Sequence, residues 1–98
     1  MLNQIILVGR VIDIPTPESE ERATIEIAVQ RTIKNLNGEY ESDNIKVILF
    51  KQLSNATLEY LHKGDIVGIK GRIQTDENKN IQIVAEKLTF LTSSKKED

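Results

Sequence analysis

Two stretches with apolar residues at every second position flank Asn37-Gly38, and they constrain the fold more than any other feature of this sequence. Every second residue from Ile25 to Val29 and from Ile45 to Leu49 is apolar. The second face of the first stretch carries Thr24, Glu26, Ala28 and Gln30, and that of the other stretch carries Asn44, Lys46, Ile48 and Phe50. A period of two is typical of strands that bury one face, and Asn-Gly is a strong signal for a β-hairpin. The sequence therefore predicts a hairpin with a common apolar face, which consists of Ile25, Ile27, Val29, Ile45, Val47 and Leu49.

The stretch before this hairpin has a different strand character. Residues 3–14 carry apolar side chains on both faces, which is typical of a strand that is central or buried at a subunit contact. Gly9 interrupts the run and predicts a bulge or bend of the kind that curls a sheet. Residues 15–22, with two prolines and an acidic cluster, are expected to form a loop.

The second half of the chain begins with a change of period. Residues 52–62 place Leu53, Ala56, Tyr60 and Leu61 on one helical stripe, and Gly64 follows at a capping position. This pattern predicts a short helix in which Tyr60 packs into the core. Two further strands follow, and the first of them is expected to point Val67, Ile69 and Ile73 inward. These strands span residues 65–75 and 81–91, with a turn over 76–80.

The order strand, strand, strand, helix, strand, strand predicts an all-β fold with one short helix. It is the layout of a five-stranded OB-fold, the small Greek-key barrel. A chain of 98 residues is one domain. We expect the barrel to cover residues 1–91 and residues 92–98 to form a short polar tail.

Composition excludes several function classes. The chain has no Cys and one His, His62, so it lacks the residues of a usual zinc site and a thiol nucleophile. No nucleophile and base pair is evident, so we expect no enzyme activity, no metal and no cofactor. The acidic run at 18–21 lacks calcium-loop spacing. No stretch approaches the length of a membrane helix and no signal peptide is evident, which predicts a cytoplasmic location.

Charge alone does not point to a nucleic acid, because 13 basic residues face 15 acidic ones and the pI is about 5.4. The signs are nevertheless segregated, with cations in or near strands and acids mostly in loops, and such a chain can carry a positive groove. The alternative is a set of solvated strand faces. The cations that we predict to contact phosphates are Arg10, Arg31, Lys34, Lys46, Lys70, Arg72 and Lys79.

Two aromatic side chains are candidates for stacking on bases. Phe50 shares a strand face with Lys46, opposite the expected core, which is the minimal combination of stacking surface and phosphate contact. Its alternative is packing against the helix or a neighbouring subunit. Tyr40 follows the Asn37-Gly38 turn in a polar arm, where it either stacks on a base or packs on its own hairpin.

Specific segments of the sequence resemble the bacterial single-stranded DNA-binding proteins. The most specific are residues 60–65 with 67–75, and residues 3–10, 27–31 and 46–53 add shorter matches in the same order. The resemblance implies an OB barrel, a homo-oligomer in which a tetramer is favoured over a dimer, and sequence-independent binding of single-stranded DNA during replication, recombination or repair. It also implies a stacking role for Phe50 and association with the nucleoid. We predict that the first strand, through Ile6 and Val8, forms the oligomer contact.

The sequence also departs from this family. Ile33 and Asn44 stand where the family often has aromatic residues, and the sequence ends at Asp98 without the acidic, Phe-ended tip that recruits partner proteins. Short relatives such as the primosomal replication proteins share these losses. The departures leave an alternative open: an OB-fold interaction module with weak DNA affinity, acting with replication or recombination proteins.

Overall fold

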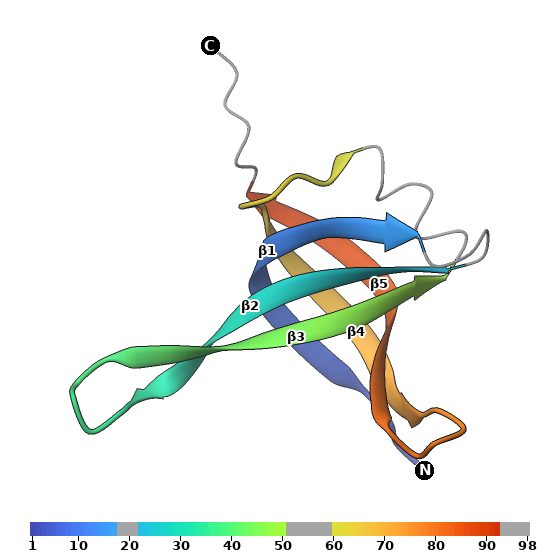
Figure 1. Cartoon of the computed structure of the whole chain (residues 1–98), viewed down its shortest axis with the longest axis horizontal. Coiled ribbons are helices and arrows are strands. Elements are labelled where there is room, and N and C mark those ends of the chain that lie inside the picture. Colours follow the sequence, from blue (N-terminus) through green and yellow to red (C-terminus); the bar gives the residue numbers. More distant parts are fainter. Residues whose placement is uncertain (18–21, 51–59, 93–98) are drawn as a thin grey trace.

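The computed structural model describes residues 1–17, 22–50 and 60–92, and within them five strands form a closed barrel (Figure 1). The order around the barrel is β1-β2-β3-β5-β4, which is the predicted five-stranded Greek-key arrangement. Neighbouring strands are antiparallel except β3 and β5, which run parallel. The strands are β1 (Ile5–Pro17), β2 (Arg22–Lys34), β3 (Tyr40–Phe50), β4 (Ile66–Thr75) and β5 (Ile81–Thr92).

The alternating positions of the central hairpin form the core, as predicted. Ile25, Ile27 and Val47 are at most 1% exposed, and Val29 and Ile45 pack against the core from its edge. Burying side chains of this size stabilises the fold by about 1.5–3 kcal/mol each. These core residues fill the inward positions of β2 and β3, so the alternate side chains of both strands point away from the core.

Two apolar residues of the strands differ from the prediction. Ile73 was expected inward but is 40% exposed. The reason is that β1 begins at Ile5, opposite Gly71, and the residue that reaches Ile73 is the polar Asn3, whose side chain hydrogen-bonds the Ile73 backbone at 2.6 and 3.0 Å. No apolar residue of β1 therefore lies beside Ile73. Ile48 lies on the outer side of β3 and is nevertheless buried, because Thr24 of β2 and Val84 of β5 flank it.

Gly9 marks a close approach of two strands rather than a bulge. A Cβ at this position would lie 2.7 Å from the Ala28 carbonyl oxygen. β1 pairs with β4 as far as Arg10 and with β2 from Arg10 onward, so Gly9 lies next to the point where the strand changes partners. The register shifts of β1 come later, on either side of Asp13. The predicted loop over 15–22 is also shorter, because β1 extends to Pro17 and β2 begins at Arg22.

The predicted hairpin is present, and its arm projects from the barrel (Figure 1). Residues 35–39 connect the two strands, which is longer than a two-residue turn. The Asn35 side-chain oxygen accepts hydrogen bonds from the backbone of Asn37 and Glu39, both at 2.9 Å. Gly38 adopts a φ of 78°, which favours glycine.

The predicted helix over 52–62 falls mostly on residues 51–59, which lie outside the described residues. Tyr60, expected in the core, is 63% exposed, and its neighbour Leu61 is buried in the core instead. The sequence pattern gave no sign of Asp65, whose buried carboxylate accepts a hydrogen bond from the His62 backbone at 2.8 Å. Among the described residues, no helix is long and apolar enough to cross a membrane.

Candidate nucleic-acid interface

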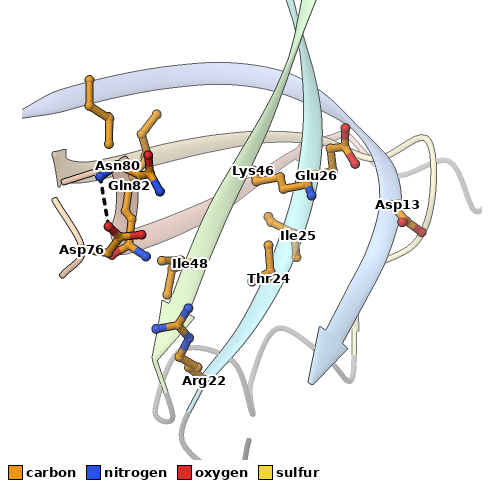
Figure 2. A pocket seen from close by; sticks show the side chains of 12 residues that line it. Asp13, Arg22, Thr24, Ile25, Glu26, Lys46, Ile48, Asp76, Asn80 and Gln82 are labelled. Carbon is orange, nitrogen blue, oxygen red and sulfur yellow. Dashed lines mark hydrogen bonds between the residues drawn. The ribbon is translucent and has the colours of Figure 1, made fainter. Parts of the chain in front are cut away.

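A groove of about 800 Å³ lies against the outer side of β2 and β3 (Figure 2). Asp13 of β1 lies at one side of it, and Asp76 and Asn80 of the β4–β5 turn lie at the other. The turn is held in shape by the Asp76 carboxylate, which accepts the Asn80 backbone N–H at 2.9 Å. The face of β2 and β3 together with the flanking loops is where OB barrels hold oligonucleotides.

Three cross-strand pairs lie on the face of β2 and β3 that the groove covers, and all of their residues except Phe50 line the groove. Arg22 lies opposite Phe50, Thr24 opposite Ile48, and Glu26 opposite Lys46. Side chains that are paired in this way contact one another on the same face of a sheet. The groove therefore offers a cation at one end, an apolar floor, and a carboxylate beside an ammonium group at the other end. The Phe50 ring lies next to the cation on the same face, outside the groove lining.

The outer side of β3 also connects the groove with the hairpin arm. By the alternation of the strand, Tyr40, Lys46 and Phe50 point to the same side, and the two aromatic rings are 50% and 39% exposed. At about 3.3 Å per residue the two ring positions are roughly 33 Å apart. Lys34 holds its ammonium nitrogen 5.6 Å from the centre of the Tyr40 ring. Three of the predicted site residues thus follow one line along β3, and Lys34 of β2 lies beside the first of them.

Arg31 is engaged by acids of its own hairpin. Its guanidinium donates two hydrogen bonds to the Asp43 carboxylate, at 3.0 and 2.8 Å, and lies 3.5 Å from Glu41. The hydrogen bond from Arg31 lowers the pKa of Asp43, and the same bond raises the pKa of Arg31. The predicted phosphate contact of Arg31 therefore requires that these carboxylates release or share the guanidinium.

Lys70 and Arg72 lie on the outer side of β4, around the barrel from Lys46. Arg72 pairs with Val84 of β5, and Val84 pairs with Ile48 of the groove floor. One residue of β5 therefore separates Arg72 from the groove floor. Its guanidinium lies 3.3 Å from the Glu86 carboxylate. Lys70 lies between Ile6 of β1 and Lys87 of β5, and this position is farther from the groove.

The two remaining predicted cations lie at the margins. Arg10 is opposite Ala28 on the outer side of β1 and donates a hydrogen bond to the Gly64 carbonyl at 3.3 Å. Lys79 adopts a φ of 65° in the β4–β5 turn, next to the groove residue Asn80. Among the described residues, no group of three or more His, Cys, Asp or Glu side chains could hold a metal ion.

Comparison with protein-family models identifies what kind of barrel this is. The model described as the single-strand binding protein family matches residues 2–91. The chain belongs to this family. Similar proteins include the single-stranded DNA-binding protein 2 of Staphylococcus aureus strain Mu50, 40% identical over 93% of this chain and 73% of that protein. The single-stranded DNA-binding protein 1 of Lactococcus lactis is 36% identical over 97% of this chain and 71% of that protein.

Solved structures show that the family's fold is shared. The mitochondrial single-stranded DNA-binding protein of S. cerevisiae superposes with a TM-score of 0.76 at 17% identity, covering 97% of this chain and 99% of that one. A small single-stranded DNA-binding protein from Streptomyces coelicolor gives a TM-score of 0.70 at 20% identity, covering 92% and 94%. At sequence identities this low, the comparison shows that the barrel fold is shared.

Some groove residues of this single-strand binding family member were missed by the sequence prediction. Arg22 was assigned to a loop, although extending the alternation by two residues places it on the same face as Thr24. Glu26 was seen only as an outward strand position. Asp76 and Asn80 are distant in sequence from β2, and only the closure of the barrel brings them to the groove.

Proposed function

We propose that this protein binds single-stranded DNA in the groove on β2 and β3, as a binding protein without catalytic activity. The single observation that carries the assignment of the site is the row of Arg22, Ile48 and Lys46 in the groove, with Phe50 beside Arg22 on the same outer face. Such binding needs cations for the phosphates and flat surfaces for the bases. Membership of the single-strand binding family supports the function itself.

The proposed mechanism combines two kinds of contact. Bases stack on the exposed ring of Phe50, and on Tyr40 where the strand continues along the arm. Lys46, Lys34 and Arg22 hold phosphates beside these rings, and Lys79, Arg10 and Arg72 add charge at the margins. Arg31 joins them only by exchanging its carboxylate partners for phosphate. Sequence-independent binding of this kind suits replication, recombination or repair in the cytoplasm.

The proposed assembly is a homo-oligomer, with a tetramer favoured over a dimer. Ile6 and Val8 are 67% and 53% exposed on the outer side of β1. Exposed apolar residues that adjoin one another are typical of protein contacts. A second copy that covers Ile6 also approaches Lys70, which is its cross-strand neighbour. We therefore propose Lys70 as a rim residue of the contact as well as a phosphate ligand.

Fluorescence anisotropy of a labelled oligo-dT about 35 nucleotides long tests the function directly, because a strand of this length covers several OB barrels. We expect saturable binding to the single strand, with little binding to a duplex of the same length. The logarithm of the affinity should fall by about 0.7 for each phosphate neutralised as salt rises tenfold. Binding that is insensitive to salt would contradict the proposed phosphate contacts.

One observation favours the second candidate, an OB-fold interaction module with weak DNA affinity. Arg31 and Arg72 are both paired with carboxylates, which leaves fewer cations for phosphates. Absence of binding to oligo-dT even at low salt would support this candidate. The barrel would then act through replication or recombination proteins.

A further inference from the structure

Glu26 and Lys46 form an open pair of opposite charges in the groove. They are direct cross-strand partners, and both line the groove. Cross-strand partners have Cβ atoms about 5 Å apart, which is close enough for long side chains to meet. The ion pairs of the described residues nevertheless join other groups, and neither Glu26 nor Lys46 has a hydrogen-bond partner among them. A hydrogen-bond acceptor and a donor therefore stand side by side, both available to a ligand.

The surroundings favour the edge of a base over a phosphate at this position. Asp13 of β1 lies directly opposite Glu26, so two carboxylates adjoin on the same face. Two adjoining negative charges repel a phosphate. Ile48 lies two residues from Lys46 on the same side of β3 and provides an apolar surface for the base itself.

The chemistry of the pair matches one base better than the others. An ionised carboxylate only accepts hydrogen bonds, and an ammonium group only donates them. The Watson–Crick edge of guanine places the acceptor O6 beside two donors, N1–H and the N2 amino group, and single-stranded bases expose this edge to proteins. Cytosine and adenine offer one amino donor. Thymine offers one imide N–H between two carbonyl oxygens, one of which would face the carboxylate.

We propose that Glu26 and Lys46 recognise guanine, giving a preference for this base within otherwise unselective binding. When guanine occupies this position, the Glu26 carboxylate accepts N1–H and the N2 amino group, and the Lys46 ammonium donates to O6 in place of the phosphate contact proposed for it above. This inference rests on the proposed function, because it requires a single strand in the groove. It makes Glu26 a specificity-determining residue.

Short oligonucleotides test the preference. Oligo-dT of about 12 nucleotides lies within the span of one OB barrel, and its central thymine is replaced by guanine or by hypoxanthine, which lacks the N2 amino group. We expect the guanine strand to bind about fivefold more tightly than all-thymine, at the lower end of what bidentate recognition of a base provides. The hypoxanthine strand should fall between the two.

Two matched variants separate recognition from charge. Glu26→Gln should bring the ratio of guanine to thymine affinity close to one while affinity for all-thymine is unchanged or higher. Asp13→Asn removes the same charge from the neighbouring position and should raise both affinities and preserve the ratio. Equal affinities of the wild-type protein for the three strands would overturn the inference. An equal fall of the guanine-to-thymine affinity ratio in both variants would overturn it as well. Either result would leave the proposed function intact. Failure to bind any strand would contradict the proposed function itself.

Discussion

At the scale of single residues, the availability of a charge depends on its neighbours more than on its identity. Arg31 donates two hydrogen bonds to Asp43, so a phosphate must compete with a carboxylate that already satisfies the guanidinium. Lys46 has no such partner among the described residues. Two cations of the same hairpin therefore differ in what they can contribute to a bound strand, although the sequence alone presents them as equivalent.

Phe50 is the side chain whose replacement should weaken binding most clearly. Phe50→Ala removes an exposed ring beside Arg22, and stacking of one base is worth about 1–3 kcal/mol. We expect the affinity for oligo-dT to fall by roughly 5-fold to 150-fold, measured by anisotropy. Phe50→Tyr keeps the ring and should retain the affinity. Tyr60→Ala removes an exposed ring that lies outside the β2–β3 face, and a comparable loss there would argue against stacking at Phe50.

At the scale of elements, alternation identified the strands because each one buries a single face. Ile25 and Val47 could be assigned inward from the sequence, and both are buried. Strand ends were less predictable, since pairing with a neighbour extended β1 and β2 beyond the alternating stretch. Ile73 was misassigned because its exposure depends on where β1 begins, and no local pattern contains that information.

The site was predictable only in part for the same reason. Lys46 and Phe50 share a face through local alternation, so sequence reasoning could bring them together. The opposing sides of the groove, Asp13 and Asp76, belong to other elements. Their placement follows from the register of β1 on β2 and from barrel closure, which involve residues far apart in the chain.

Two glycines of β4 offer a test of how closely the strands pack. A Cβ at Gly71 would collide with the Val84 carbonyl of β5, whereas a Cβ at Gly68 would lie 3.7 Å from the Leu91 side chain. Gly71→Ala should lower the free energy of unfolding by about 1–3 kcal/mol, the usual cost of overpacking. Gly68→Ala should change it by less than about 1 kcal/mol. Denaturant titration measures both, and equal effects would show that the strands can move apart at Gly71.

At the scale of the whole molecule, the exposed side of β1 is the proposed contact between copies. Ile6 and Val8 adjoin Lys70 and Gly68 of β4 across the strand pair. A lysine at either apolar position would place an unpaired charge in a desolvated contact, which is costly. Ile6→Lys or Val8→Lys should therefore give a monomer and a lower sedimentation coefficient. Ile81→Lys changes an exposed residue at the groove instead and should leave the assembly intact. An unchanged coefficient for both β1 variants would refute this contact.

The parallel junction of β3 and β5 has a mechanical consequence. It joins Val47 to Ile83 and Ile48 to Val84, and every other junction in the barrel is antiparallel. If this junction alone parted, the strands would unroll into one continuous antiparallel sheet in the order β3-β2-β1-β4-β5. The groove is lined by Lys46 and Ile48 on the β3 side of the junction and by Gln82 and Ile83 on the β5 side. A DNA strand bound across this junction would contact both β3 and β5. Bound DNA would therefore oppose their separation and stabilise the closed barrel against unrolling.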